Sequence, residues 1–498
     1  NESPDAEEPS WPSQASFGRA PSFTSGAGIG CGACRGHTCV MRCGFACVIL
    51  VGSVACAQPL PDAGDGSSTT STTDTTTNVN ATDSTTEPLG TTVGVDSTTT
   101  SSDTETDSTT GPPPMCSAPD GTYGAEPCPD TDPFCVGGMC TACNNAVSNT
   151  SCFEHDEAPG DVCAADGRCV VCTPDEDSAC ELDVANPYCD PETNECAPCS
   201  EHAHCGMAAC NLFNGQCVPG MVVTVLPGPG ALVAAVNAVT AAGGGTIIVN
   251  EGTYDEVITI NSNAIVGFLA EAGASPEWRR TSGAGAPQLR VTGGATVLVD
   301  GIDFRLNNSS VDSAIRIDSA NSRFWADRST IAQNFGVGVR AEGSAELRMR
   351  NCFVGGANNI DALEVITSAI ARVRYSTLGA AFSGSNAISC DATATVTVSD
   401  SILIAADSTA ELACDGIDAD HIVTNTMVVL GTGNMAIGST DEAWFADYGN
   451  GDFHLVGEGV TEFATLGEWN ADDPTVDIDG DPRPTTDPSE DYVGADIP

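Results

Sequence analysis

The sequence predicts a mainly β fold in which a solenoid of repeated strands follows a disulfide-rich module and a Ser/Thr-rich stalk. Three observations support this prediction. Residues 67–110 contain 27 Ser or Thr among 44, residues 116–217 hold 16 of the 25 cysteines, and residues 218–498 contain segments that repeat every 23 to 27 residues. That spacing is typical of one coil of a β-solenoid.

Composition excludes several functions. The 498 residues include 68 acidic and 17 basic side chains, and the net charge of -51 disfavours binding to nucleic acid or to an anionic lipid surface as a whole. Only a local arginine cluster could reverse that effect. All 17 basic residues are arginine, which excludes Schiff-base catalysis, pyridoxal chemistry and the lysine-dependent phosphate loop.

The N-terminal part contains a predicted export signal. Residues 1–40 are expected to be upstream sequence or disordered, and residues 41–56 form a signal peptide whose apolar stretch, 43–55, is too short to span a bilayer. The end of this stretch, Val54-Ala55-Cys56, resembles the lipobox of bacterial lipoproteins, although Ser53 departs from it. The resemblance implies acylation of Cys56; the alternative is cleavage near Ala57 without lipidation. We therefore expect an extracellular or cell-surface protein of bacterial type that touches the membrane only through a lipid anchor.

Residues 57–115 are predicted to be a disordered linker. Its Ser/Thr-rich part has no aromatic and no basic residue, so it cannot bury enough apolar surface to offset the loss of chain entropy.

The cysteine-rich region, 116–217, contains a unit of the form C-x(4 to 6)-C-x2-C-x(5 to 8)-C three times. An even number of cysteines in an exported chain favours eight disulfides. Zinc is the alternative, because C-x2-C occurs in zinc ribbons and His202 and His204 lie beside Cys199 and Cys205. The spacing resembles EGF-like or TNF-receptor-like modules, which implies stiff spacers or protein-contact surfaces. The three units are Cys135/140/143/152, Cys163/169/172/180 and Cys189/196/199/205.

The C-terminal half begins with a helix, a glycine stop and two strands over residues 229–260. This pattern resembles the N-terminal cap and first coil of right-handed parallel β-helix proteins, the pectin-lyase-like superfamily. The resemblance predicts a β-helix over 221–430 and a closing segment over 431–498. Six similar segments start at Ala295, Ser322, Ala345, Ala369, Ala394 and Asp418.

Alignment of these segments predicts the register. Positions two, four and nine after each start are mostly apolar and should face inward, whereas position seven is small and polar and should lie at a turn. Asp420 is the exception in the last coil. Cys390 and Cys414 fall one coil apart, about 4.8 Å, a separation that allows either a disulfide or two stacked thiols.

The C-terminus carries three motifs: Gly-Asp-Phe-His-Leu, Asp-Ile-Asp-Gly-Asp-Pro-Arg and a terminal Asp-Tyr-Val-Gly-Ala-Asp. They resemble the ending of secreted bacterial β-helix proteins. With the cap, this resemblance covers about 270 residues.

Outward positions of the alignment carry an arginine cluster. Arg348 is predicted to stack on Arg372 and Arg350 on Arg374, beside Trp325, Asp327 and Glu346. Like charges on neighbouring strands are destabilising, so we expect an anionic ligand such as a uronic acid or another acidic glycan, with Trp325 stacked on a sugar ring. The alternative is a solvated surface on which Asp327, Glu346 and Glu342 pair with the arginines.

Catalysis is a further hypothesis. Lyases of the resembled superfamily use a basic residue with carboxylate-bound calcium, and Asp300 stacked on Asp327 beside Arg350 and Arg374 could imitate that arrangement. The Gly-His-Gly and Arg-Ile-Lys segments of its hydrolases are absent. Three functions therefore stay open: a module that binds a polysaccharide or another cell-surface component, a polysaccharide lyase, and a structural or adhesive solenoid.

Calcium is a possible cofactor near the C-terminus. Asp477, Asp479 and Asp481 alternate around Gly480 like a short acidic calcium loop. The alternative is a solvated turn, with Pro482 and Pro484 fixing the chain and Arg483 neutralising part of the charge.

Overall fold

The structure is a computed structural model. It describes residues 115–116, 122–124, 128–136, 138–143, 152, 158–281, 285–307, 313–356, 360–380, 384–405, 410–425, 429–438 and 442–498. The predicted upstream segment 1–40, the signal peptide 41–56 with Cys56, and nearly all of the linker 57–115 lie outside these residues. None of the described helices has the length and apolar character needed to cross a membrane.

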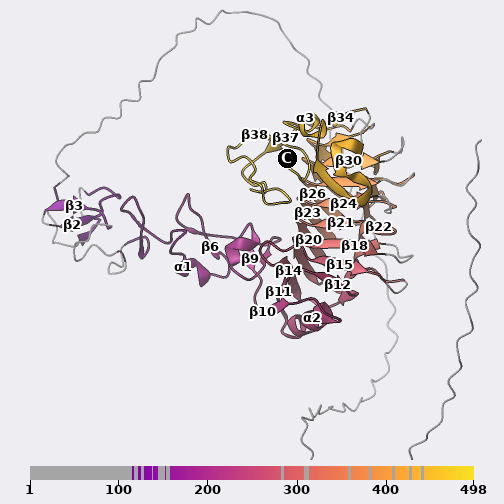
Figure 1. The fold of residues 1–498 in the computed structure, drawn as a ribbon. Coiled ribbons are helices and arrows are strands. Elements are labelled where there is room, and N and C mark those ends of the chain that lie inside the picture. Colours follow the sequence, from indigo (N-terminus) through magenta and orange to yellow (C-terminus); the bar gives the residue numbers. More distant parts are fainter. Residues whose placement is uncertain are drawn as a thin grey trace, which may run out of the picture. The chain divides into compact units, whose positions relative to one another are not determined.

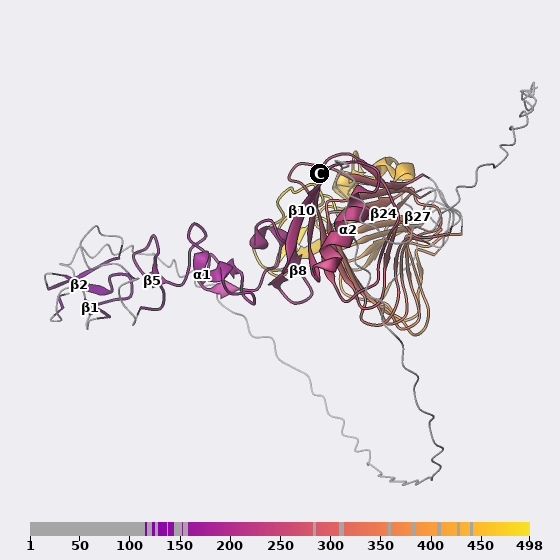
Figure 2. The same ribbon diagram turned by 90° about the horizontal axis from the view of Figure 1, so that it is seen from below.

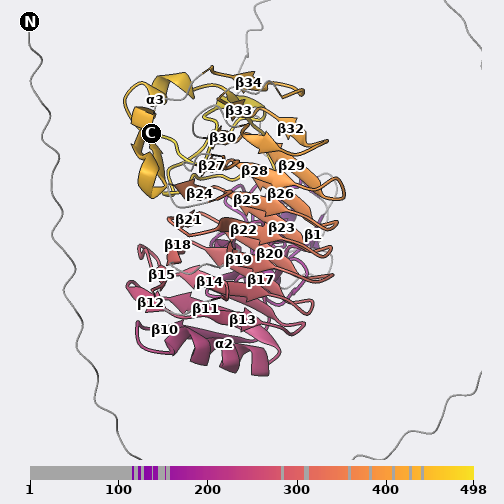
Figure 3. The same ribbon diagram turned by 90° about the vertical axis from the view of Figure 1, so that its right-hand side faces the viewer.

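The predicted fold class is confirmed. Each coil contributes one strand to each of three parallel sheets, and the coils stack into a column (Figures 1 and 3). Sheet 1 contains β10 (Met221–Val225), β11 (Gly244–Val249), β14 (Ile265–Ala270), β17 (Thr296–Asp300), β20 (Arg323–Asp327), β23 (Glu346–Arg350), β26 (Ile370–Arg374), β29 (Thr395–Ser399) and β32 (Asp418–Asp420).

Sheets 2 and 3 complete each coil. Sheet 2 contains β12 (Thr253–Asp255), β15 (Glu277–Arg280), β18 (Asp303–Asn307), β21 (Thr330–Ala332), β24 (Phe353–Gly356), β27 (Thr377–Ala380), β30 (Ile402–Ala405), β33 (Val423–Thr424) and β34 (Met435–Ala436). Sheet 3 contains β13 (Ile258–Ile260), β16 (Leu289–Val291), β19 (Ser313–Ile317), β22 (Val337–Ala341), β25 (Leu363–Val365), β28 (Ile388–Cys390) and β31 (Leu412–Ala413).

Helix α2 (Ala231–Ala241) covers the first coil, as the sequence predicts (Figure 2). Its apolar side, with Leu232, Val236 and Val239, is buried in the core of the β-helix. The carboxylate of Glu256 accepts hydrogen bonds from the backbone N–H groups of Leu232 and Val233 at 3.0 and 2.8 Å. A side chain from the following coil thereby satisfies two N–H groups that have no partner within the helix.

The interior contains the predicted ladders. The inward positions are apolar and buried in the first five aligned coils, from Val297 to Val398. The small polar positions lie at the corner between sheets 1 and 2, where the Ser329 hydroxyl accepts from the Ile302 N–H and the Ser376 hydroxyl accepts from the Cys352 N–H. A serine at this corner thus satisfies a buried backbone donor of the coil before it.

The predicted register of the last coil is wrong by three residues. Asp418 pairs with Thr397 and Asp420 with Ser399, so Ala419 faces inward. The sequence alignment had placed His421 opposite Thr397. The cause lies between sheets 3 and 1: Ala413 pairs with Ser389, and the chain reaches the position opposite Thr397 after five residues, where the coil before it takes eight.

The eight predicted disulfides are present, but the repeat unit differs from the predicted one. Four modules begin at Cys116, Cys143, Cys172 and Cys199, and each joins its first cysteine to its third and its second to its fourth. The C-x2-C element therefore joins two modules rather than lying inside one. The bonds are Cys116–Cys135, Cys128–Cys140, Cys143–Cys163, Cys152–Cys169, Cys172–Cys189, Cys180–Cys196, Cys199–Cys210 and Cys205–Cys217.

A short antiparallel hairpin in each module places its third and fourth cysteines opposite each other. With every cysteine of 116–217 in a disulfide, no thiolate is left for zinc. The elements are β1 (Thr122–Tyr123), β2 (Phe134–Val136), β3 (Met139–Thr141), β4 (Val162–Cys163), β5 (Cys169–Val170), α1 (Ser178–Glu181), β6 (Tyr188–Cys189), β7 (Cys196–Ala197), the 3-10 helix η2 (His202–Cys205), β8 (Cys210–Asn211) and β9 (Gln216–Cys217).

The C-terminal segment packs on the outer face of sheet 2. Its aromatic side chains form a second core with Phe353 and Ile402, and Phe453 lies so close to Gly379 that a Cβ there would clash. Arg483 is fully buried, pairs with Asp491 at 2.8 Å and stacks on Tyr375. The elements are η3 (Glu442–Trp444), β35 (Phe445–Asp447), η4 (Tyr448–Asn450), β36 (Asp452–Leu455), α3 (Gly459–Glu462), β37 (Gly467–Trp469) and β38 (Ser489–Asp491).

Cys390 and Cys414 form a disulfide with a Cα–Cα distance of 4.8 Å, the coil spacing that the alignment predicts. Cys352 is the free cysteine among the described residues; it is buried, and burial raises the pKa of its thiol. A deeply buried thiol of this kind is unreactive.

Candidate functional site

An arginine groove lies on the outer face of sheet 1. The predicted stacking is present, since Arg348 pairs in register with Arg372 and Arg350 with Arg374. The groove has a volume of about 220 Å³. Its lining consists of Trp325, Arg348, Met349, Arg350, Arg372, Val373, Arg374, Thr397, Ser399, Asp472 and Pro474.

Ion pairs in this groove leave positive charge in excess. Four arginines line the groove and Arg323 lies beside them; these five guanidiniums share three carboxylates, and Asp472 at the rim adds a fourth acidic residue. Glu346 alone serves Arg348 and Arg372, each at 2.7 Å, and also Arg323 at 3.5 Å. The other two pairs are Arg350 with Asp327, at 2.6 Å, and Arg374 with Asp473.

Two of the four arginines that line the groove remain accessible. The side chains of Arg372 and Arg374 are 51% and 46% exposed, whereas those of Arg348 and Arg350 are more buried. An incoming anion would therefore meet Arg372 and Arg374 first. Two guanidiniums on adjacent strands can bind carboxylates through paired N–H groups.

Trp325 is not free to act as a sugar platform across its whole face. Phe213 of the fourth cysteine module contacts it edge to face at a centroid distance of 5.6 Å, and the Arg348 guanidinium lies over both rings. That module packs on sheet 1 through Ala209, Val218 and neighbouring apolar side chains. The fourth cysteine module therefore bounds the arginine groove on the side of Trp325.

The lyase candidates Asp300 and Asp327 lie under the same module. Both carboxylates are buried, at 6% and 4% exposure, and each is held by an arginine: Asp300 by Arg328 and Asp327 by Arg350. The space beside them, which His202 also lines, measures about 80 Å³. Small-molecule sites usually measure about 300 Å³ or more. Asp300, Asp327 and Arg350 are thus brought together as predicted, whereas Arg374 pairs with Asp473, and the space that the first three share is too small for a sugar chain in this structure.

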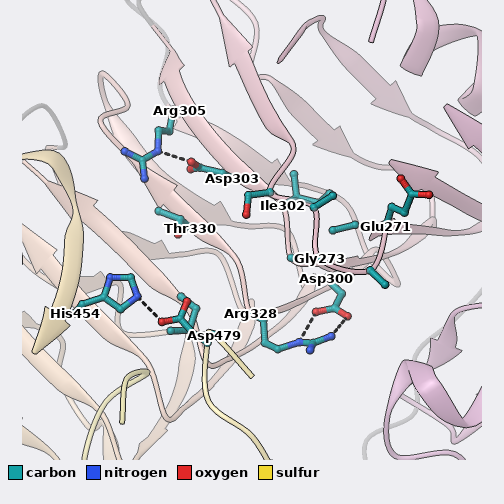
Figure 4. Close-up of a pocket in the computed structure, with 16 residues that line it drawn as sticks. Glu271, Gly273, Asp300, Ile302, Asp303, Arg305, Arg328, Thr330, His454 and Asp479 are labelled. Atoms are coloured by element: carbon teal, nitrogen blue, oxygen red, sulfur yellow. Dashed lines mark hydrogen bonds and ion pairs between the residues drawn. The ribbon is translucent and has the colours of Figure 1, made fainter. Parts of the chain in front are cut away.

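A larger pocket of about 490 Å³ lies at the corner between sheets 1 and 2 (Figure 4). Two ion pairs, Asp300 with Arg328 and Asp303 with Arg305, line it together with a close contact between His454 and Asp479. Burial raises the pKa of Asp303 to about 6, even though the Arg305 guanidinium opposes that shift.

The predicted calcium loop is a hydrogen-bonded turn. Asp477 is fully buried, and its carboxylate accepts backbone N–H groups from Asp479, Asp481 and Ile497 at 3.0, 2.8 and 2.9 Å. Asp479 and Asp481 are exposed, and the three carboxylates are not among the described groups whose ligand atoms lie within 4.8 Å of one another. Asp479 instead groups with His454 and Asp496. Arg483 pairs with Asp491 rather than with this loop.

Sequence reasoning missed several residues around the groove. Arg323 occupies the outward position one after each segment start, a position of the same alignment that could have revealed it. Phe213 and Asp473 come from outside the repeats, so no periodicity indicates that they reach the groove. Glu342, considered as a partner of these arginines, pairs on sheet 3 with Arg316 and Arg340 instead.

Comparisons with known proteins cover two parts of the chain. The model of a family described as "Family of unknown function (DUF8331)" matches residues 101–223, the range of the cysteine modules. No curated protein matches. The crystal structure of pectate lyase Pel9A aligns with 54% of this chain and 89% of its own, at 13% sequence identity and a TM-score of 0.31.

Proposed function

We propose that this chain is an exported surface protein whose β-helix binds an acidic glycan, a polysaccharide or another cell-surface component, through the arginine groove. The observation that carries the proposal is the charge imbalance in the groove. Five guanidiniums share three paired carboxylates in a chain whose net charge is -51.

Charge imbalance at this place favours an anionic ligand for two reasons. Arginines stacked on neighbouring strands repel each other unless an anion compensates them. The acidic remainder of the chain repels polyanions, so an anionic polymer gains attraction only where guanidiniums outnumber carboxylates. Uronic acids fit because each sugar carries one carboxylate, which a guanidinium can bind with two N–H groups.

Calorimetric titration of the full chain with a polyuronate oligomer tests the proposal. We expect binding that weakens as salt rises from about 50 to 200 mM, because both partners shed counterions on association. The same oligomer with its carboxyl groups reduced to alcohols is the matched control and should not bind. Equal binding of both oligomers, or binding of neither, would refute the proposal.

The polysaccharide lyase remains the alternative. It requires the fourth cysteine module to leave the Asp300/Asp327 face, because His202 and its neighbours enclose that space. Incubation with polyuronate and calcium, followed by ultraviolet absorbance of the unsaturated product, tests it. Product formation by the disulfide-intact chain would favour the lyase over a binding module.

Export and lipid anchoring are part of the proposal. The disulfide-rich modules fit an oxidising compartment, and the sequence before Cys56 resembles a lipobox. Cys56→Ala should release the mature protein from the membrane fraction into the medium. Unchanged membrane association of the variant would contradict the anchor and leave glycan binding unaffected.

A further inference from the structure

Three C-terminal motifs that are far apart in the sequence bring together an imidazole and two carboxylates. One ligand atom each from His454, Asp479 and Asp496 lies within 4.8 Å of the others. His454 belongs to β36, Asp479 to the turn around Gly480, and Asp496 to the chain end. His454 and Asp479 also line the 490 Å³ pocket, where they lie side by side (Figure 4).

The surroundings of His454 fix its orientation. Its Nδ1 contacts the carboxylate of Asp452, two residues earlier on the same strand, and its ring packs edge to face on Phe353 at a centroid distance of 4.8 Å. Because a carboxylate only accepts hydrogen bonds, it holds the proton on Nδ1. Metal-bound histidines commonly have a carboxylate on the nitrogen that does not bind the metal.

The other nitrogen, Nε2, is left with an unusual environment. It is shielded from solvent and makes no hydrogen bond, although Oδ2 of Asp479 lies only 2.9 Å away. In the neutral ring, Nε2 would turn its lone pair toward the carboxylates of Asp479 and Asp496, a repulsive arrangement that either a proton on Nε2 or a metal ion relieves. A proton on Nε2 would have poor geometry toward Asp479, whereas a metal ion accepts ligands from several directions.

We infer that His454 Nε2, Asp479 and Asp496 bind a divalent cation of the zinc type. An imidazole with two carboxylates suits zinc, while calcium prefers six to eight oxygens. Three protein ligands leave further coordination positions for water or a ligand from the adjoining pocket. The same ion would link β36 to the terminal Asp-Tyr-Val-Gly-Ala-Asp motif, a contact that the sequence motifs alone do not reveal.

Zinc titration of the full chain tests this inference, with calcium chloride as the competing probe. We expect one zinc bound per chain and a rise in Tm with zinc that an equal concentration of calcium does not produce. His454→Gln should weaken zinc binding at least about 100-fold, and Asp452→Asn about 10- to 100-fold, because outer carboxylates tune histidine ligands. Asp481→Asn, an exposed acidic residue of the same turn, is the matched control and should bind zinc like the unsubstituted chain.

A spectroscopic measurement keeps the test valid if a variant fails to fold. In the unsubstituted chain, zinc should shift the NMR resonance of His454 Nε2 while Nδ1 stays protonated. An absence of zinc binding, or equal affinity in His454→Gln, would show that His454 is simply an imidazolium paired with Asp452 and Asp479. Either result would overturn the metal site and leave the arginine groove untouched.

Discussion

Arginines stack on two faces of this β-helix, and the two faces differ in how their charge is balanced. On sheet 3, Arg290, Arg316 and Arg340 lie in register on successive strands, as Arg348 and Arg372 do on sheet 1. The three guanidiniums of sheet 3 pair with three carboxylates, those of Asp318, Glu342 and Glu364. Around the arginine groove on sheet 1, five guanidiniums share three paired carboxylates, with Asp472 as a fourth acidic residue at the rim.

This comparison changes the argument for a binding site. Stacked arginines alone do not indicate a ligand, because sheet 3 tolerates the same stacking once each guanidinium has a carboxylate beside it. The informative quantity is the number of guanidiniums relative to the number of carboxylates on each face. Since exposed ion pairs contribute little stability, a balanced ladder is best explained as a solvated surface, and an unbalanced one requires another source of negative charge.

The largest expected effect is a loss of polyuronate binding that distinguishes the arginines of sheet 1 from those of sheet 3. Arg372→Ala/Arg374→Ala should weaken polyuronate binding about 100-fold, because each lost charge-assisted contact removes about 1.5 kcal/mol. The matched control, Arg290→Ala/Arg316→Ala, removes the same charge from sheet 3 and should bind within about twofold of the unsubstituted chain. Calorimetry measures both. Equal losses would mean that net charge, and not the groove, controls binding.

Buried carboxylates extend the comparison to stability. Asp400, at the corner of sheet 1, accepts the Glu468 N–H and forms no ion pair with a described arginine, and burial raises its pKa to about 6. A raised carboxyl pKa contributes stability that is fully present below pH about 3.8 and is lost as pH rises through about 6. Asp400→Asn should therefore raise the unfolding free energy at pH 7 by up to about 3 kcal/mol.

Asp318 on sheet 3 is the matched control for this change. It is buried like Asp400 but pairs with Arg290 at 2.7 Å and with Arg316 at 3.3 Å. Asp318→Asn removes a compensated charge and should lower stability at pH 7. Denaturant melts at pH 4, 5.5 and 7 compare the two variants; a pH-independent effect of Asp400→Asn would contradict the raised pKa.

Sequence periodicity predicts the parts of this molecule in which each coil repeats the last. The inward ladders and the register of Arg348 on Arg372 follow because parallel strands stack residue on residue. The last coil escapes prediction because its chain takes three residues fewer between the paired positions of sheets 3 and 1. The turn at the corner between sheets 1 and 2 is predicted, but the positive φ that Arg328 and Tyr375 adopt there is not, since neither residue type indicates it.

The sequence could not predict the contacts between the fourth cysteine module and sheet 1, because these two parts of the chain share no repeat. Phe213 on Trp325 and the enclosure of Asp300 depend on how the fourth cysteine module packs on sheet 1. The module boundaries themselves depend on which cysteines a hairpin brings face to face. Spacing alone could not distinguish the C-x2-C pairs within a module from those between modules.

The substitution with the smallest expected effect increases the excess of guanidiniums over carboxylates instead of reducing it. Glu346 pairs with Arg348, Arg372 and Arg323, so Glu346→Gln leaves three guanidiniums with one carboxylate fewer. Binding of a polyuronate should strengthen about two- to fivefold, because a freed exposed ion pair is worth about 0.5 to 1 kcal/mol. Glu342→Gln makes the same change on sheet 3, where Glu342 pairs with Arg316, and should leave the affinity unchanged. If Glu346→Gln weakens binding instead, Glu346 serves to position the arginines for the ligand, and the excess of guanidiniums is not by itself the source of affinity.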